Sequence, residues 1–124
     1  MRILFIILSL LHVPFVITYM EYYERFYSEL PWFEYGNHFF IFHIVFAVII
    51  GVIASRIPLR WFIIVNACVV LTHGLLPAIL ISEEHAYWFA PLTPVTVMVL
   101  SALVYIAIQG IIRWFTLKIP KLIR

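Results

Sequence analysis

Residues 56–60 read Arg-Ile-Pro-Leu-Arg and separate two long stretches that carry no charged side chain. The stretch before them covers residues 38–55, and the stretch after them reaches residue 82. Proline is accepted in the first turn of a helix and disfavours helix in the residue before it. The segment therefore predicts a tight basic turn between two helices that are antiparallel neighbours.

Charges elsewhere in the chain follow the same division. Acidic residues fill the gap before residue 38 and the gap after residue 82, whereas basic residues precede the first apolar stretch and follow the last. Arg25 is the one basic residue on the acidic side. Because cytoplasmic loops of membrane proteins are enriched in Lys and Arg, this alternation predicts four spans with both termini cytoplasmic.

Composition points to the same class. A chain of 124 residues with 65% hydrophobic and 11% charged side chains has too much apolar surface for a soluble core of its size. We therefore expect an all-α integral membrane protein with one domain, an up-down-up-down four-helix bundle. Each span has about the 20 residues that cross a bilayer core. The predicted spans are residues 3–22, 38–55, 58–81 and 93–115, with outer loops at 23–37 and 82–92 and a basic tail at 116–124.

Small residues mark faces on which the spans are expected to pack. Helices in lipid associate through close backbone approach, since lipid tails are as apolar as the helices themselves. Ala47, Gly51 and Ser55 recur every four residues, and Gly74 with Ala78 forms a shorter seam. Both sets predict helix–helix contacts.

Polar residues inside the spans suggest a second kind of packing contact. Ser101, Tyr105 and Gln109 share one face of the last span. Asn66 lies at a comparable depth in the third span, so we expect it to hydrogen-bond to Gln109 or Tyr105. Structural pairing is the main interpretation, and a substrate path lined by these groups is the alternative.

Three histidines fall at a similar depth in the outer half of three spans. His12 and His73 each lie at a depth of roughly 13 Å, and His43 is somewhat shallower. Ionisable residues at such depths are uncommon and usually face the interior of a bundle. They predict a shared polar pocket that opens outward, with Glu21 as an orienting or cation-pairing acid.

Two prolines are placed to loosen the helices around this pocket. Pro14 has no N–H to donate to the carbonyl of Leu10, and Pro77 has none for the carbonyl of His73. A third proline, Pro94, follows Thr93 and predicts a helix start with Thr93 as the N-cap.

Several chemistries are open to such histidines. A neutral imidazole can relay protons, act as acid or base, or bind a metal or haem. Haem b held by His12 and His73 is an alternative, but satisfied interhelical hydrogen bonds are the main interpretation, with no cofactor and no metal site. The spans hold no deep Asp, Glu, Lys or Arg, which disfavours ion-coupled transport, and no nucleophile lies beside an oriented base. An enzyme is therefore the less favoured class.

Short pieces of the chain are similar to a known membrane family. His12-Val13-Pro14, Met20-Glu21 and Leu75-Leu76-Pro77 are similar to pieces of the four-helix emopamil-binding and sigma-2-receptor type family, which binds sterol-like amines. The resemblance implies a hydrophobic ligand between the helices. The chain departs from that pattern in its short first loop and in His43, where the family would have an intramembrane carboxylate.

Two functions of different class follow. The first is a non-catalytic accessory, assembly or regulatory partner of a larger membrane system, in contact with the lipid bilayer and with another membrane protein or a second copy of itself. The alternative is a binder of, or enzyme on, a lipid-like hydrophobic ligand that uses the histidine pocket. We expect a multi-pass protein of the bacterial plasma membrane. The formal net charge of +2 is a topology signal and not evidence for nucleic acid.

Overall fold

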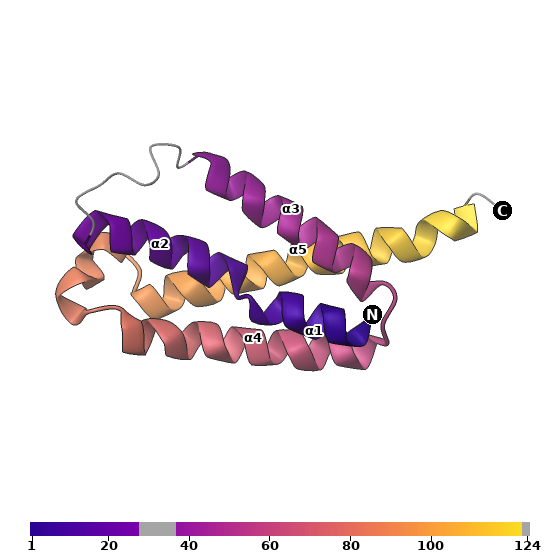
Figure 1. The fold of residues 1–124 in the computed structure, drawn as a ribbon, viewed down its shortest axis with the longest axis horizontal. Coiled ribbons are helices and arrows are strands. Elements are labelled where there is room, and N and C mark those ends of the chain that lie inside the picture. The colour runs from indigo at the N-terminus through magenta and orange to yellow at the C-terminus, as the bar shows by residue number, and fades with distance from the viewer. Residues whose placement is uncertain (28–36, 123–124) are drawn as a thin grey trace.

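The computed structural model describes residues 1–27 and 37–122, with the backbone alone at 37–39 and 120–122. The predicted outer loop at residues 28–36 and the last two residues of the tail lie outside this range. The structure is 88% helical and contains no strand in the described residues. Its elements are α1 (Arg2–Leu10), α2 (Val13–Tyr27), α3 (Asn37–Ala54), α4 (Leu59–Leu80), the short 3-10 helix η1 (Glu83–Phe89) and α5 (Pro94–Leu122), as Figure 1 shows.

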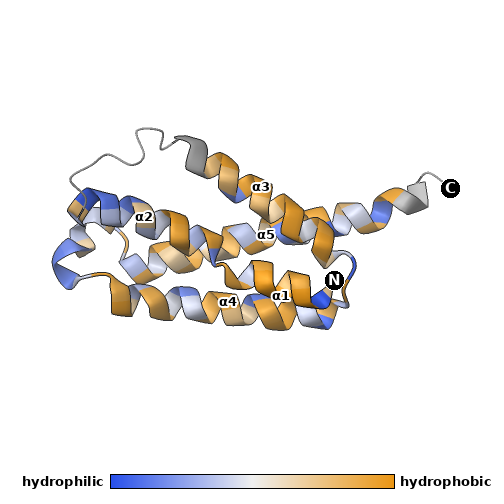
Figure 2. Ribbon diagram, viewed as in Figure 1, coloured by the Kyte–Doolittle hydropathy of each residue, from blue (hydrophilic) through white to orange (hydrophobic). Residues whose placement is uncertain are grey.

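The helices are as apolar as the composition requires. Within the described residues, three segments are long and apolar enough to cross a membrane, and Figure 2 shows the hydrophobic residues along them. They are Arg2–Tyr27, which joins α1 and α2, then Leu59–Leu80 and Pro94–Ile119, with a shorter apolar helix at Phe40–Ala54. This pattern indicates an integral membrane protein.

Helix α5 is the centre of the packing. It packs along both α3 and α4 and also contacts α2 and η1, while α1 lies against α4 and α3. The predicted neighbour relation between the two helices that flank the basic turn is wrong, because α3 and α4 share almost no contact along their lengths. Both helices instead place their small or polar residues against α5.

Gly51 explains why α3 faces α5. A Cβ atom built on Gly51 would lie 2.8 Å from the Cβ of Ile112 and 2.9 Å from the carbonyl oxygen of Gln109, so only glycine allows this approach. Ala47 is fully buried beside it, and Ser55 is half-buried with its hydroxyl bonded to its own helix. The seam on α3 thus lies at a close helix–helix contact.

The second small-residue seam is looser. A Cβ atom on Gly74 would meet Val99 at 3.7 Å, which is ordinary van der Waals contact, and Ala78 is exposed. This part of α4 therefore does not need a small residue for its contact with α5.

Arg113 joins the basic turn to α5. Its guanidinium group donates to the carbonyl of Ala54 at 2.8 Å and to the carbonyl of Ile57 at 3.3 Å. Carbonyls at the end of a helix have no partner within the helix, and a cation there is also favoured by the helix dipole. One side chain of α5 therefore closes the end of α3 and holds the turn.

Three predicted boundaries differ from the structure. The first span is interrupted at Leu11 and His12, and the outer segment after residue 82 includes η1. The last helix continues through the predicted tail to Leu122. The predicted start of this helix is confirmed, because the Thr93 hydroxyl accepts the backbone N–H of Thr96 at 3.1 Å.

Candidate functional site

The histidines that were predicted to share one pocket lie in two separate parts of the structure. His12 and His73 lie together between the α1–α2 break and α4, with ring centroids 5.1 Å apart. His43 lines a separate groove between α3 and α5. Glu21 lies on α2, and in the described part of the chain it makes no hydrogen bond to the stacked pair His12 and His73. The structure therefore pairs two of the predicted residues and leaves the other two apart from them.

The side chain of His12 replaces a helix hydrogen bond that Pro14 cannot make. Proline cannot donate to the carbonyl of Leu10, and the ring Nδ1–H of His12 donates to that oxygen instead, at 2.6 Å. The backbone of His12 has a φ of 49°, a left-handed conformation that histidine adopts more readily than most residues. The side chain thereby satisfies the carbonyl that the sequence leaves without a donor.

The other ring nitrogen of His12 connects the break to α4. The His12 Nε2 and the Thr72 hydroxyl oxygen lie 2.5 Å apart. Because Nδ1 carries the ring proton in this arrangement, the Thr72 hydroxyl is the donor in this bond, which competes with its bonds to the carbonyls of Val69 and Cys68. A residue at the break between α1 and α2 is thus hydrogen-bonded directly to α4.

His73 is the more buried partner, with no exposed surface. Its Nδ1–H donates to the carbonyl of Val69 at 2.8 Å, and the edge of Phe15 packs against its ring. Its Nε2 is buried and has no hydrogen-bond partner among the described residues. The stacked rings therefore pack the α1–α2 break against α4, and the Nε2 of His73 accepts no hydrogen bond from the described residues.

This geometry does not fit the haem alternative. Two histidines that bind one haem iron point a nitrogen at the metal from opposite sides of the porphyrin. Here the rings lie face to face with planes 20° from parallel, and one nitrogen of each ring is hydrogen-bonded to a carbonyl. Both rings would have to move apart and rotate to bring their Nε2 atoms to opposite faces of a porphyrin. Among the described residues, no group of three or more His, Cys, Asp or Glu could hold a metal ion.

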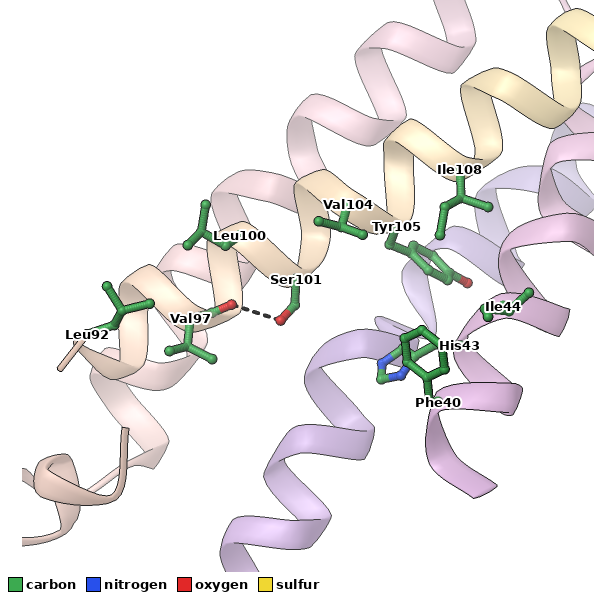
Figure 3. A pocket seen from close by; sticks show the side chains of 10 residues that line it. All are labelled: Phe40, His43, Ile44, Leu92, Val97, Leu100, Ser101, Val104, Tyr105 and Ile108. Atoms are coloured by element: carbon green, nitrogen blue, oxygen red, sulfur yellow. Dashed lines mark hydrogen bonds between the residues drawn. The ribbon is translucent and has the colours of Figure 1, made fainter. Parts of the chain in front are cut away.

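The groove that contains His43 is the more open of the two places. It has a volume of about 370 Å³ and lies between α3 and α5, which Figure 3 shows as its two walls. Its lining is apolar apart from three side chains. The lining residues are Phe40, His43, Ile44, Leu92, Val97, Leu100, Ser101, Val104, Tyr105 and Ile108.

The three polar side chains of the groove differ in what they can offer a ligand. The Ser101 hydroxyl donates to the carbonyl of Val97 at 2.8 Å, so it presents only oxygen lone pairs. Tyr105 is 5% exposed, and its hydroxyl is buried without a hydrogen-bond partner in the described structure. In Figure 3 its ring extends from α5 toward α3, and the half-buried His43 approaches the same region from α3. A donor and an acceptor therefore lie within an otherwise apolar groove.

Asn66 and Gln109 meet as the sequence suggested, although loosely. The Asn66 amide donates to the Gln109 side-chain oxygen at 3.5 Å, and both residues are buried. Tyr105, the other predicted partner of Asn66, makes no hydrogen bond to it. The pair is polar packing between α4 and α5, and it leaves the Tyr105 hydroxyl without a hydrogen-bond partner among the described residues.

Sequence reasoning missed a third cluster, at the end of the molecule where α2 meets η1. The N–H of Ser82 donates to the Tyr22 hydroxyl at 3.3 Å, and that hydroxyl donates to Nδ1 of His85 at 2.7 Å. Phe26 stacks on His85 with centroids 3.9 Å apart. The cluster fastens α2 to η1. The density of aromatic residues was a visible signal, but which tyrosine is buried depends on helix phase.

The chain was also compared with known proteins. It matches no protein-family model, no curated protein and no solved structure. Function must therefore be inferred from the site itself.

Proposed function

We propose that this chain is a four-helix membrane bundle with both termini in the cytoplasm, in the plasma membrane of a bacterium. The ends of the helices support this topology. The N-terminus, the α3–α4 turn and the C-terminal half of α5 lie at one end, and the end of α2 and η1 lie at the other (Figure 1). The first end carries Arg2, Arg56, Arg60, Arg113 and Lys118, and the second carries Glu21, Glu24, Glu83 and Glu84 beside Arg25. Lys and Arg favour the cytoplasmic side.

Helix α3 is the shortest of the four proposed spans. Its 18 residues correspond to about 27 Å of helix, close to the thickness of a bilayer core. Topology can be tested with single cysteines in a Cys68→Ala background. An impermeant maleimide added to intact cells should label Glu83→Cys and spare Lys118→Cys. Labelling of Lys118→Cys from outside would overturn the orientation.

The function that the geometry supports best is binding of a lipid-like hydrophobic ligand in the groove between α3 and α5. The observation that carries it is Tyr105, a residue that lines this apolar groove and whose buried hydroxyl has no hydrogen-bond partner among the described residues. Ligand sites are typically apolar cavities of about 300–1,000 Å³ with a few polar groups that fix orientation. A buried polar group without a partner costs roughly 1–3 kcal/mol, so a ligand atom that accepts from Tyr105 would recover part of that cost.

The position of the groove also restricts the ligand. The groove opens on the surface of α3 and α5 that would contact lipid, where its lining residue Leu100 is 46% exposed. A ligand can enter from the bilayer without crossing the bundle. We therefore propose an amphiphile with an apolar body beside Leu100 and Val104 and a hydrogen-bonding group near His43, Ser101 and Tyr105.

Two leucines of α5 offer a matched test. Leu100 lines the groove, whereas Leu103 is 48% exposed and does not. The experiment compares Leu100→Trp with Leu103→Trp by extracting each purified protein and identifying the retained lipids by mass spectrometry. Leu100→Trp should fill the groove and lose a lipid that the wild type and Leu103→Trp keep. Equal lipid content in all three proteins would contradict the proposal.

An accessory role is the second candidate, and Gly110 favours it. Among the described residues, no atom of another part of the structure lies within 4 Å of the position that a Cβ on Gly110 would take, and the nearby Ala107 is exposed. Small residues on an open face let a helix of another protein approach closely. Purification in mild detergent should then recover a stoichiometric partner that Gly110→Leu loses. A monodisperse wild-type protein without any partner would count against this role.

A further inference from the structure

A second cavity lies at the basic end of the molecule, away from the groove. It has a volume of about 410 Å³ and is lined by Ser55 and Arg56 after α3 and by Thr116, Leu117 and Ile119 of α5. One cation and two hydroxyls thus lie beside two apolar side chains that are about half exposed. This combination is amphipathic, as a lipid headgroup site at the edge of a membrane must be.

Arg56, the cation of this cavity, does not hold other parts of the described structure together through its side chain. Arg113 gives its guanidinium to the carbonyls of Ala54 and Ile57, whereas Arg56 is exposed and makes no hydrogen bond or ion pair through its side chain in the described structure. All described carboxylates lie at the opposite end of the helices. A phosphate group would therefore meet a planar, bidentate donor with no competing acid.

The two hydroxyls define the rest of the headgroup. Ser55 donates to the carbonyl of Val52 at 2.7 Å, and Thr116 donates to the carbonyl of Ile112 at 2.8 Å. With their protons committed to their own helices, both oxygens act as acceptors. They suit a headgroup that brings hydroxyl donors together with its phosphate.

We propose that this cavity binds an anionic phospholipid of the cytoplasmic leaflet whose headgroup carries hydroxyl groups. Arg56 binds the phosphate, Ser55 and Thr116 accept from the headgroup hydroxyls, and Leu117 and Ile119 contact the acyl end of the lipid. This inference goes beyond the groove ligand, and it rests on the membrane topology proposed above. The anionic surface of a cytoplasmic leaflet supplies the complementary charge.

The test uses the full chain and two arginines of the same turn region. Arg56 lines the cavity, and Arg60 is an equally exposed cation that does not. Purified wild type, Arg56→Gln and Arg60→Gln are mixed with equal amounts of phosphatidylglycerol and phosphatidylcholine, and the bound lipids are counted by native mass spectrometry. Arg56→Gln should lower retention of phosphatidylglycerol roughly fivefold, and Arg60→Gln should leave it unchanged.

Three results would overturn the site. Equal losses in both variants would indicate general attraction to basic charge, and no loss in either would remove Arg56 from binding. Displacement of the lipid by millimolar glycerol phosphate would indicate a site for a soluble phosphate. Circular dichroism and elution volume check that each variant is folded. Because Leu100 is outside this cavity, failure here leaves the outcome of the Leu100→Trp test unaffected.

Discussion

The imidazole of His12 lies face to face with that of His73, with ring centroids 5.1 Å apart and planes 20° from parallel. This stack joins the break between α1 and α2 to the middle of α4. It replaces, with side chains, the continuity that Pro14 removes from the first span. Its role in the fold can be separated from any chemical role by mutation.

The bond from His12 to the carbonyl of Leu10 should matter only while residue 14 is proline. His12→Ala should lower the free energy of unfolding by about 1–3 kcal/mol, because the carbonyl of Leu10, on a surface that we propose faces lipid, loses its donor. In a Pro14→Ala background the new N–H can donate to that carbonyl. The same His12→Ala change should then cost at least about 0.5 kcal/mol less. Denaturation in mixed micelles measures all four proteins, and strictly additive costs would contradict this explanation of the break.

Two glycines should respond oppositely to the same substitution. Gly51→Ala introduces a methyl group 2.8 Å from Ile112 and 2.9 Å from the Gln109 carbonyl, so it should destabilise the fold by about 1–3 kcal/mol. Gly110→Ala meets no atom within 4 Å and should be neutral or stabilising by up to about 1 kcal/mol. Unfolding in mixed micelles provides the comparison. A similar loss in both variants would show that α3 does not approach α5 at Gly51.

Arg113 should stabilise the end of the molecule that holds the turn between α3 and α4. Arg113→Gln removes two charged hydrogen bonds to the carbonyls of Ala54 and Ile57 and should cost about 1.5–3 kcal/mol. Arg60→Gln removes an exposed cation and should change stability by less than about 0.5 kcal/mol. The same unfolding measurement decides between them. If the two variants are equally stable, the contact does not hold the turn.

Tyr22 should stabilise the segment around η1 without affecting the rest of the molecule. Tyr22→Phe removes the hydroxyl that joins Ser82 to His85, whereas Tyr23, next in the chain, is exposed and serves as the control as Tyr23→Phe. Hydrogen exchange followed by mass spectrometry should show faster exchange in residues 82–89 for Tyr22→Phe alone. Unchanged exchange there would mean that the aromatic packing alone fastens η1.

Much of the helical layout was predictable because it follows from one-dimensional patterns. The uncharged stretches and the basic turn at residues 56–60 placed α3 and α4 to within a residue of their ends. The cap at Thr93 followed from a local motif, and its hydrogen bond is present. Such features depend on neighbours in sequence, which is why they can be seen without coordinates.

Features that depend on helix rotation were not predictable in the same way. Depth alone grouped His43 with His12 and His73, but depth does not say which helices are adjacent or which faces meet. The arrangement of α3 and α4 on α5 placed His43 beside Tyr105 instead. The short turn implied that α3 and α4 are neighbours, whereas the close approach at Gly51 directs α3 to α5.

Photo-crosslinking tests the groove between α3 and α5 most directly. A fatty acid with a diazirine near its chain end is added to the purified protein, irradiated and mapped by mass spectrometry. We expect labels concentrated on groove residues such as Leu100, Val104 and Ile108, and their loss in Leu100→Trp but not in Leu103→Trp. Labels spread evenly over the exposed apolar faces, unchanged by Leu100→Trp, would contradict a ligand site in this groove.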